Sequence, residues 1–397
     1  MRKFERIITI VLDSVGIGSA PDATAFGDQG ADTLGHLCSY WEGELALPQL
    51  TELGLGRICR DEPLKGVKAR SKLSSAVGKM REISAGKDSM DGHWEMMGVP
   101  VKEPLDTFPN GFPYELVDKI EKFSNRKVLL NQPYSGTQAI KDYGEKQIAE
   151  GGLIVYTSGD SVIQVAAHEA VVPVDELYRI CRFIRFTLDD SSWNVGRVIA
   201  RPFVGQNPDD FERTANRHDF SMVPKQATVL DLLNANGVSV CGIGKINDIF
   251  SGRGIDSQVH TTSNLDGLNQ ILAALDNQKY KFVFANLVDF DSNYGHRRDA
   301  KGYGIELEQV DQKLRDVVSN ISETDLLIVT ADHGNDPTFR GNDHTREYVP
   351  LLVYSTNLSN ADLGIRETFS DLGATILDNF GIEDNLINAT SFLNQLR

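Results

Sequence analysis

Three short apolar segments, each followed closely by an aspartate, limit the folds open to this chain of 397 residues. The segments span residues 7–12, 282–288 and 326–329. Short, wholly apolar runs are typical of strands buried on both faces, as in parallel sheets covered by helices. Ligands of open parallel sheets bind beyond the carboxyl ends of the strands. Polar residues that follow these segments are therefore expected to lie at a binding or catalytic site.

Residues of metal-ligand type follow all three segments. They are Asp13 after the first, Asp291 and His296 after the second, and Asp332, His333 and, after a short gap, His344 after the third. One Asp-His pair by itself would indicate only a capped turn, but six such groups at the ends of neighbouring strands are hard to explain by packing. Together they suffice for two ions, and a mixed Asp/His set suits manganese or zinc better than calcium. Four other histidines, His36, His168, His218 and His260, are assigned no role.

Ser89 lies in a small, polar segment, residues 84–95, that is predicted to be a loop entering a helix. Amides at a helix start can help to hold a phosphate, which makes the Ser89 hydroxyl a candidate nucleophile. The alternative is that Ser89 only caps the helix. The segment 13–18, with Gly16 and Gly18, predicts a turn in which the backbone can approach a bound group.

The charge and composition of the chain limit which molecules it is expected to bind. The net charge of −16 argues against nucleic-acid and anionic-membrane surfaces. It is compatible with a small phosphorylated substrate, because two divalent cations would leave a local positive excess among three aspartates. No segment approaches the ~20 apolar residues that span a bilayer, and the first apolar run is too short for a signal peptide. The scattered cysteines, Cys38, Cys59, Cys181 and Cys241, predict reduced thiols in a cytoplasmic protein.

Two domains are expected from the length of the chain. Prolines 100, 104, 109 and 113 indicate a crossing into a second unit, and an irregular stretch, 205–222, indicates the return. Between them we predict helices at 114–123 and 175–186 and strands at 152–156 and 197–204. We predict an α/β core with a central, mostly parallel sheet between helix layers, formed by residues 1–103 and 222–397. A smaller α+β cap domain, residues 104–221, would interrupt this core.

Four motifs together resemble the bacterial phosphopentomutases of the alkaline phosphatase superfamily. They are Asp13–Gly18, Gly86–Ser89 with Gly92–Glu95, Asp291 with Gly295–Arg298, and Asp332–Asp336 with Asp343–Glu347. The resemblance runs along nearly the whole chain and includes residues 156–161 and 196–202. In one respect the chain departs from the family, whose nucleophile motif carries threonine where this chain has Ser89. Serine is used elsewhere in the superfamily, so the reaction class survives this departure.

The resemblance implies an alkaline-phosphatase-like three-layer core, two manganese ions and a phosphorylated enzyme. It implies one ion on Asp13, Asp332 and His333 together with the nucleophile Ser89, and the other on Asp291, His296 and His344. In the cap domain it implies that Ser158 and Asp160 contact the sugar, and that Arg197 and Arg213 hold the distal phosphate, with Arg217 a weaker candidate.

The activity implied is the interconversion of ribose (or 2-deoxyribose) 1-phosphate and 5-phosphate through a phosphoenzyme and a bisphosphate. A hexose or pentose bisphosphate would be the activator, because something must first charge Ser89. No protein partner is implied. Three alternatives stay open at this point: a cofactor-independent phosphoglycerate mutase, a metal-dependent phosphohydrolase of the same superfamily, and a metal-binding protein without activity.

Overall fold

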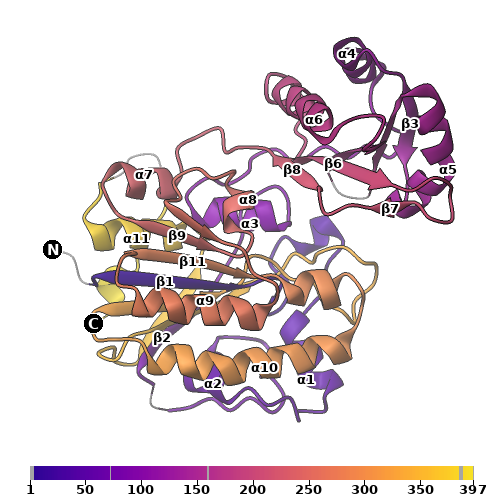
Figure 1. Cartoon of the computed structure of the whole chain (residues 1–397). Coiled ribbons are helices and arrows are strands. Elements are labelled where there is room, and N and C mark those ends of the chain that lie inside the picture. Colours follow the sequence, from indigo (N-terminus) through magenta and orange to yellow (C-terminus); the bar gives the residue numbers. More distant parts are fainter. Residues whose placement is uncertain (1–3, 72, 159–160, 384–387, 397) are drawn as a thin grey trace. The chain divides into compact units, whose positions relative to one another are not determined.

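A computed structural model describes residues 4–71, 73–158, 161–383 and 388–396 (Figure 1). The chain divides into two compact units. The first, called the core unit here, comprises Met1–Lys102 and Pro224–Arg397, and the second, called the inserted unit, comprises Glu103–Val223. Each unit is described by itself below.

The core unit is built on a sheet of eight strands in the order β10-β9-β11-β1-β12-β13-β2-β14. The strands are β1 (Arg6–Leu12), β2 (Ser75–Met80), β9 (Val240–Ile243), β10 (Ser257–Val259), β11 (Phe282–Leu287), β12 (Asp325–Thr330), β13 (Val349–Tyr354) and β14 (Ala361–Arg366). All neighbours are parallel except the two pairs that involve β13. The predicted mostly parallel sheet is therefore confirmed, and its three apolar segments are the adjacent strands β11, β1 and β12.

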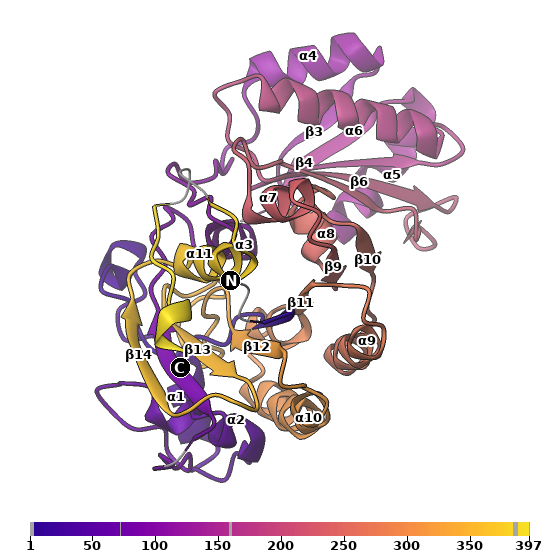
Figure 2. The same ribbon diagram turned by 90° about the vertical axis from the view of Figure 1, so that its left-hand side faces the viewer.

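Helices cover both faces of this sheet, which gives three layers (Figures 1 and 2). One layer contains α1 (Thr33–Tyr40), α2 (Pro48–Glu52), α9 (Asn264–Asp276) and α10 (Ala300–Ser319), and the other contains α3 (Ser89–Met96), α7 (Val229–Ala235), α8 (Ile246–Ile249) and α11 (Ser370–Phe380). Short helical turns are η1 (Ala23–Phe26), η2 (Leu55–Arg57), η3 (Phe290–Gly295) and η4 (Leu393–Gln395). Helix α10 begins at Ala300, where the Asp299 side chain caps it by accepting from the amide of Gly302.

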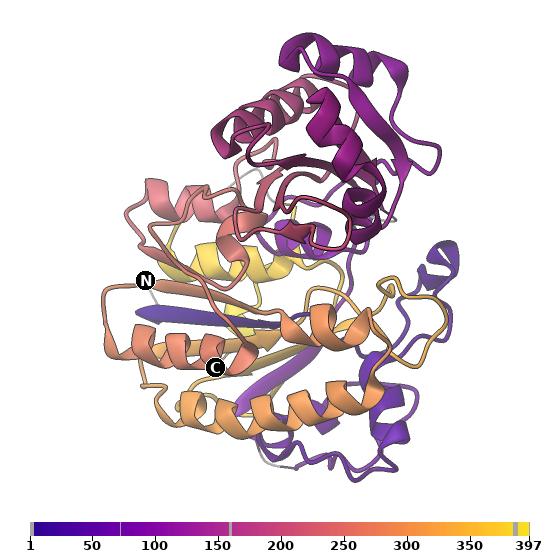
Figure 3. The same ribbon diagram turned by 45° about the vertical axis from the view of Figure 1, so that its right-hand side comes forward.

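The inserted unit contains a second sheet, in the order β3-β4-β5-β6-β7, with β8 paired to β6. Its strands are β3 (Val128–Pro133), β4 (Leu153–Thr157), β5 (Val162–His168), β6 (Arg197–Val204), β7 (Glu212–Arg213) and β8 (His218–Ser221). Helices α4 (Tyr114–Ser124) and α6 (Val174–Asp189) lie on one face, and α5 (Gly136–Glu150) lies on the other (Figure 3).

Several elements of the inserted unit were not predicted. The stretch 205–222, expected to be irregular, contains β7 and β8, so that expectation is wrong. Both strands are short and largely polar, and their pairing with β6 provides the structure that their own pattern does not indicate. The helix α5 and the strands β3 and β5 were also missed. Helix α5 carries Gly144 inside it and β3 leaves half of its residues exposed, whereas β5 is almost wholly buried and its omission has no such reason. None of the helices in the described ranges combines the length and apolar character that a bilayer span requires.

Candidate metal centre

The carboxyl ends of the three central strands bring the predicted aspartates together. In register, Leu12 of β1 faces Leu287 of β11, and Val11 faces Thr330 of β12, so the strands end at the same edge. Asp13 and Asp332 follow β1 and β12, and Asp291 lies in η3, a short π-helical turn after β11. Such turns are frequent at functional sites. All three carboxylates are buried, so each requires a compensating charge or hydrogen bond.

The first group of side chains converges on His333. Its Nε2 atom lies 3.5 Å from Asp13 Oδ1, 3.4 Å from Asp332 Oδ2 and 3.2 Å from Ser89 Oγ. Asp13 Oδ1 and Asp332 Oδ2 are buried and accept no hydrogen bond from the described residues. Buried carboxylate oxygens without partners are costly, and two that face one imidazole nitrogen and one hydroxyl form a donor set that fits a divalent cation.

The second group contains Asp291, His296 and His344. Asp291 Oδ2 lies 3.2 Å from His296 Nε2, and Asp291 Oδ1 lies 3.3 Å from His344 Nε2. The two Nε2 atoms are 3.1 Å apart. His296 Nδ1 donates to the carbonyl of Asn342 at 2.8 Å, which leaves its Nε2 atom available as a ligand. These three residues could hold one ion.

Asp291 also lies within reach of the first group. Ligand atoms of Asp13, Asp291 and His333 fall within 4.8 Å of one another, so the two groups meet at Asp291. All six predicted ligand residues and Ser89 are thus brought together at one edge of the core sheet, although they come from four separate parts of the chain.

The buried carboxylates and imidazoles of this cluster shift one another's pKa values. Burial, followed by the charges of Asp332 and Asp291, raises the pKa of Asp13 to about 7. Burial alone would lower the pKa of His333, but the carboxylates of Asp332, Asp13 and Asp291 prevail and raise it to about 9. Burial would raise the pKa of Asp332, but the imidazoles of His333 and His93 lower it to about 2. An arriving cation would therefore displace protons from Asp13 and His333.

Ser89 is held by the start of α3. The cap of this helix is Asp88, whose carboxylate accepts from the amides of Met90 and Asp91, while the Asp91 side chain accepts from the Asp88 amide at 3.3 Å. The alternative that Ser89 serves as the cap is therefore wrong. Its hydroxyl instead faces His333, at the first turn of a helix whose dipole favours negative charge.

Three residues to which the sequence analysis assigned no role contact the candidate ligands. His93, fully buried, donates from Nδ1 to the carbonyl of Ser89 at 2.7 Å and lies 3.2 Å from Asp332 Oδ2. The amide of Asn286 donates to Asp13 Oδ2 at 2.9 Å and lies 3.2 Å from His93 Nε2. The amide of Asn335 donates to Asp291 Oδ1 at 2.7 Å. Partners of this kind orient metal ligands.

A backbone contact completes the support of Asp332. Its Oδ1 atom accepts from the amide of Ser14 at 3.0 Å. Ser14 adopts a φ of 71°, which is uncommon for a residue other than glycine, and its hydroxyl forms a 2.9 Å hydrogen bond with that of Tyr303. The predicted turn after β1 thus presents an amide to the site.

The remaining predicted residues belong to the inserted unit. Ser158 follows β4, Arg197 begins β6 and Arg213 lies in β7, whereas Asp160 lies outside the described residues. Arg197 Nη1 is 3.8 Å from Asp219 Oδ2, and the exposed Arg217 makes two 2.8 Å hydrogen bonds to the same carboxylate. The Nε atom of Arg213 is buried and has no hydrogen-bond partner among the described residues.

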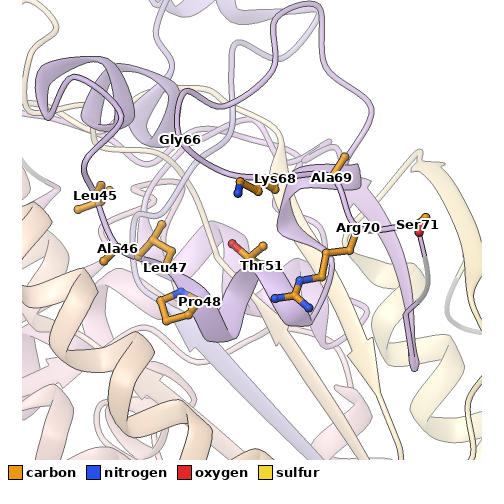
Figure 4. A pocket seen from close by; sticks show the side chains of 10 residues that line it. All are labelled: Leu45, Ala46, Leu47, Pro48, Thr51, Gly66, Lys68, Ala69, Arg70 and Ser71. Atoms are coloured by element: carbon orange, nitrogen blue, oxygen red, sulfur yellow. The ribbon is translucent and has the colours of Figure 1, made fainter.

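A cavity of about 740 Å³ lies elsewhere in the core unit (Figure 4). It is lined by Leu45, Ala46, Leu47, Pro48, Thr51, Gly66, Lys68, Ala69, Arg70 and Ser71. None of the predicted ligands, nor Ser89, lines it, so it is separate from the candidate metal centre.

Comparison with known proteins identifies the family. The family model described as the Metalloenzyme superfamily matches residues 5–384. The chain is 56% identical to a phosphopentomutase of Limosilactobacillus reuteri over 395 residues, which is 99% of each chain. It is 54% identical to a phosphopentomutase of Levilactobacillus brevis over 396 residues, which is 100% of each chain.

A solved structure supports the fold. The PH0037 protein from Pyrococcus horikoshii is similar with a TM-score of 0.50 at 12% identity, over 96% of this chain and 99% of that chain. The family resemblance expected from the motifs is confirmed by the two relatives. The chain belongs to the phosphopentomutases, within the metalloenzyme superfamily.

Proposed function

We propose that this protein, an isomerase by its family, interconverts ribose or 2-deoxyribose 1-phosphate and 5-phosphate through a phosphorylated Ser89 and a bisphosphate intermediate. One observation carries the proposal beyond family membership. The Ser89 hydroxyl lies 3.2 Å from His333 Nε2, beside both groups of candidate ligands, at the start of a helix that another residue caps. A hydroxyl so directed suits a nucleophile.

We assign two divalent ions to the site, with manganese as the proposed metal and zinc or another divalent ion as the alternative. One set of ligands is Asp13, Asp332 and His333 with Ser89, and the other is Asp291, His296 and His344. When bound, such ions offset the charge of a phosphoryl group in transfer. The unpartnered carboxylate oxygens of Asp13 and Asp332 support the first set.

The residues of the chain act on the phosphoryl group in two symmetric steps. In the first, the Ser89 Oγ–P bond breaks as a sugar hydroxyl takes the phosphoryl group, and the proton of that hydroxyl passes to Ser89. In the second, the sugar bisphosphate returns its other phosphate to Ser89. The first turn of α3 favours negative charge on the phosphoserine. His93 donates to the carbonyl of Ser89 and so holds the backbone that carries the hydroxyl.

The inserted domain, residues 104–221, is proposed as a cap that closes over the sugar phosphate and excludes water, while residues 1–103 and 222–397 form the catalytic domain. Ser158 and Asp160 would contact the sugar, and Arg197 and Arg213 the distal phosphate. A hexose or pentose bisphosphate is the proposed activator, because it can charge Ser89 without a second enzyme.

Small sugar phosphates are the proposed partners, and the net charge of −16 does not suit nucleic acid or an anionic membrane. We propose a cytoplasmic location, where free thiols such as those of the four cysteines persist.

The test is to incubate the manganese-loaded protein with ribose 1-phosphate and a bisphosphate primer, and to measure ribose 5-phosphate against free phosphate. We expect ribose 5-phosphate to be the dominant product. Free phosphate as the main product would instead identify a phosphohydrolase, and turnover of phosphoglycerate in place of ribose phosphate would identify the other mutase. Either result would overturn the proposal.

A further inference from the structure

Two basic side chains connect the turn before the nucleophile with the segment that carries His344. The nucleophile turn is defined here as residues 82–89, and the ligand segment as residues 343–346. Both belong to the core unit. Neither Lys87 nor Arg346 belongs to the predicted ligand sets, so their contacts need a separate explanation.

Arg346 holds the nucleophile turn from one side. Its side chain is only 1% exposed. The Nη1 atom donates to the carbonyl of Gly86 and to Glu82 Oε2, both at 2.7 Å. The Nη2 atom donates to the carbonyl of Glu82 at 2.8 Å and to Asp22 Oδ2 at 2.9 Å. The guanidinium thus donates to the nucleophile turn and to Asp22, the residue just before η1.

Lys87, a residue of the turn itself, contacts two acidic residues outside it. Its ammonium lies 2.9 Å from Asp28 Oδ2 and 3.2 Å from Asp343 Oδ2. Asp28 Oδ2 also accepts from the amide of Arg346 at 2.9 Å. Asp343 and Arg346, which flank His344, therefore contact Lys87 and Gly86, which directly precede the Asp88–Ser89 pair. Asp28 contacts both Lys87 and the Arg346 amide and so links the two contacts.

We infer that Lys87 and Arg346 are positioning residues. They hold Ser89 at a fixed position relative to His344, so that the hydroxyl faces both groups of candidate ligands at once. The inference rests on the proposed function of Ser89. Buried ion pairs contribute little net stability once desolvation is counted, so stability alone is a weak reason for so many charged contacts at this place. Correct geometry has a large effect on rate, since a misplacement of ~1 Å can cost ~100-fold.

Lys87 is the better residue to test. Removing Arg346 would leave Glu82 and Asp22 without their partner inside the protein, and that variant is at risk of not folding. Lys87→Met removes the ammonium and retains most of the apolar stem, whereas Lys87→Arg keeps the charge. The matched control is Lys313→Met, which removes a lysine of α10 that lies 3.0 Å from Asp316 Oδ2.

The experiment measures phosphorylation of Ser89 by a labelled hexose bisphosphate, Mn²⁺ affinity, and the kcat and KM for ribose 5-phosphate. We expect Lys87→Met to slow phosphorylation and to lower kcat by roughly 10- to 100-fold. Mn²⁺ affinity and KM should stay near their original values, because neither the ligands nor the proposed substrate contacts change. Lys87→Arg should recover most of the lost rate, and Lys313→Met should behave like the original protein.

Three results would overturn the inference. Lys87→Met could become phosphorylated at the original rate, it could lose Mn²⁺ affinity in proportion to its lost activity, or Lys87→Arg could be as slow as Lys87→Met. The second result would make Lys87 a support of the metal site alone. Failure of the original protein to be labelled at Ser89 is a different outcome, since it would refute the proposed function itself.

Discussion

Asn286 provides the sharpest test of how the candidate metal centre is supported. Its amide, buried in β11, donates to Asp13 Oδ2 at 2.9 Å and lies 3.2 Å from His93 Nε2. The substitution Asn286→Ala removes this donor without touching any predicted ligand. Asn335→Ala is the matched variant, because Asn335 donates at 2.7 Å to Asp291, the carboxylate at which the two ligand groups meet.

The magnitude follows from the type of hydrogen bond that is lost. A hydrogen bond to a charged group contributes ~1.5–3 kcal/mol, which corresponds to a loss of roughly 10- to 100-fold in affinity at ~1.4 kcal/mol per decade. Losses of ~10- to 100-fold are usual when an outer partner of a metal ligand is removed. We therefore expect Asn286→Ala to weaken one Mn²⁺ site by this factor.

The loss should depend on pH in a defined direction. The pKa of Asp13 is already raised to about 7, mainly by burial. Since the donor favours the ionised carboxylate, its removal raises this pKa further. Below that pKa the metal-free protein holds a proton on Asp13 that an ion must displace. The deficit of Asn286→Ala relative to the original protein should therefore be larger near pH 6 than near pH 9.

The assay is a Mn²⁺ titration of the original protein and both variants, followed by calorimetry and by the electron paramagnetic resonance of free Mn²⁺. Asn286→Ala should weaken one site and leave the other close to its original affinity. Asn335→Ala should instead weaken the Mn²⁺ affinity of both sites, because Asp291 belongs to both groups of neighbouring ligand atoms. Unchanged affinity of both sites in Asn286→Ala, or a deficit that grows as pH rises, would refute the reasoning.

Three further predictions concern the nucleophile, the inserted domain and stability. Ser89→Ala should give neither phosphoprotein nor mutase activity, whereas Ser89→Thr should retain both; a labelled Ser89→Ala would disprove the assignment. Arg197→Ala and Arg213→Ala should weaken capture of the sugar phosphate roughly tenfold or more and raise free phosphate relative to ribose 5-phosphate; an unchanged product ratio with both rates intact would exclude substrate contact. Arg6→Met should lower the free energy of unfolding by roughly 3 kcal/mol, because Asp325 loses hydrogen bonds of 2.8 and 3.0 Å; unaltered denaturant midpoints would contradict this.

The amino-acid sequence was sufficient to predict which residues come together at the candidate metal centre. Asp13, Asp291 and Asp332 follow apolar runs, and a run of that kind reports burial on both faces without any knowledge of its neighbours. The carboxyl ends of adjacent parallel strands necessarily meet at one edge, so the clustering of these residues follows from local pattern and one rule of topology. The motifs around them also identified the family.

The supporting residues could not be found in this way. His93 and Asn286 lie within a helix and a strand, where their patterns predict only packing or a satisfied hydrogen bond. Asn286 is 193 residues from His93 along the chain, and both matter only because β11 and α3 bring them beside Asp13. The ion pairs of Lys87 with Asp28 and Asp343, on which its proposed positioning role rests, likewise join segments that are far apart in the sequence.

The same distinction explains the elements that were missed. The strand β14 has only one fully buried residue, and β8 has none, so neither has the apolar pattern of a strand. Strand β14 pairs with β2, which is far away in the sequence, and β8 pairs with β6 across the segment that contains β7. Local pattern determines which residues avoid water, and hence the core strands and the candidate ligands at their ends. Edge strands and the partners of ligands depend on contacts between distant segments, which only the tertiary structure decides.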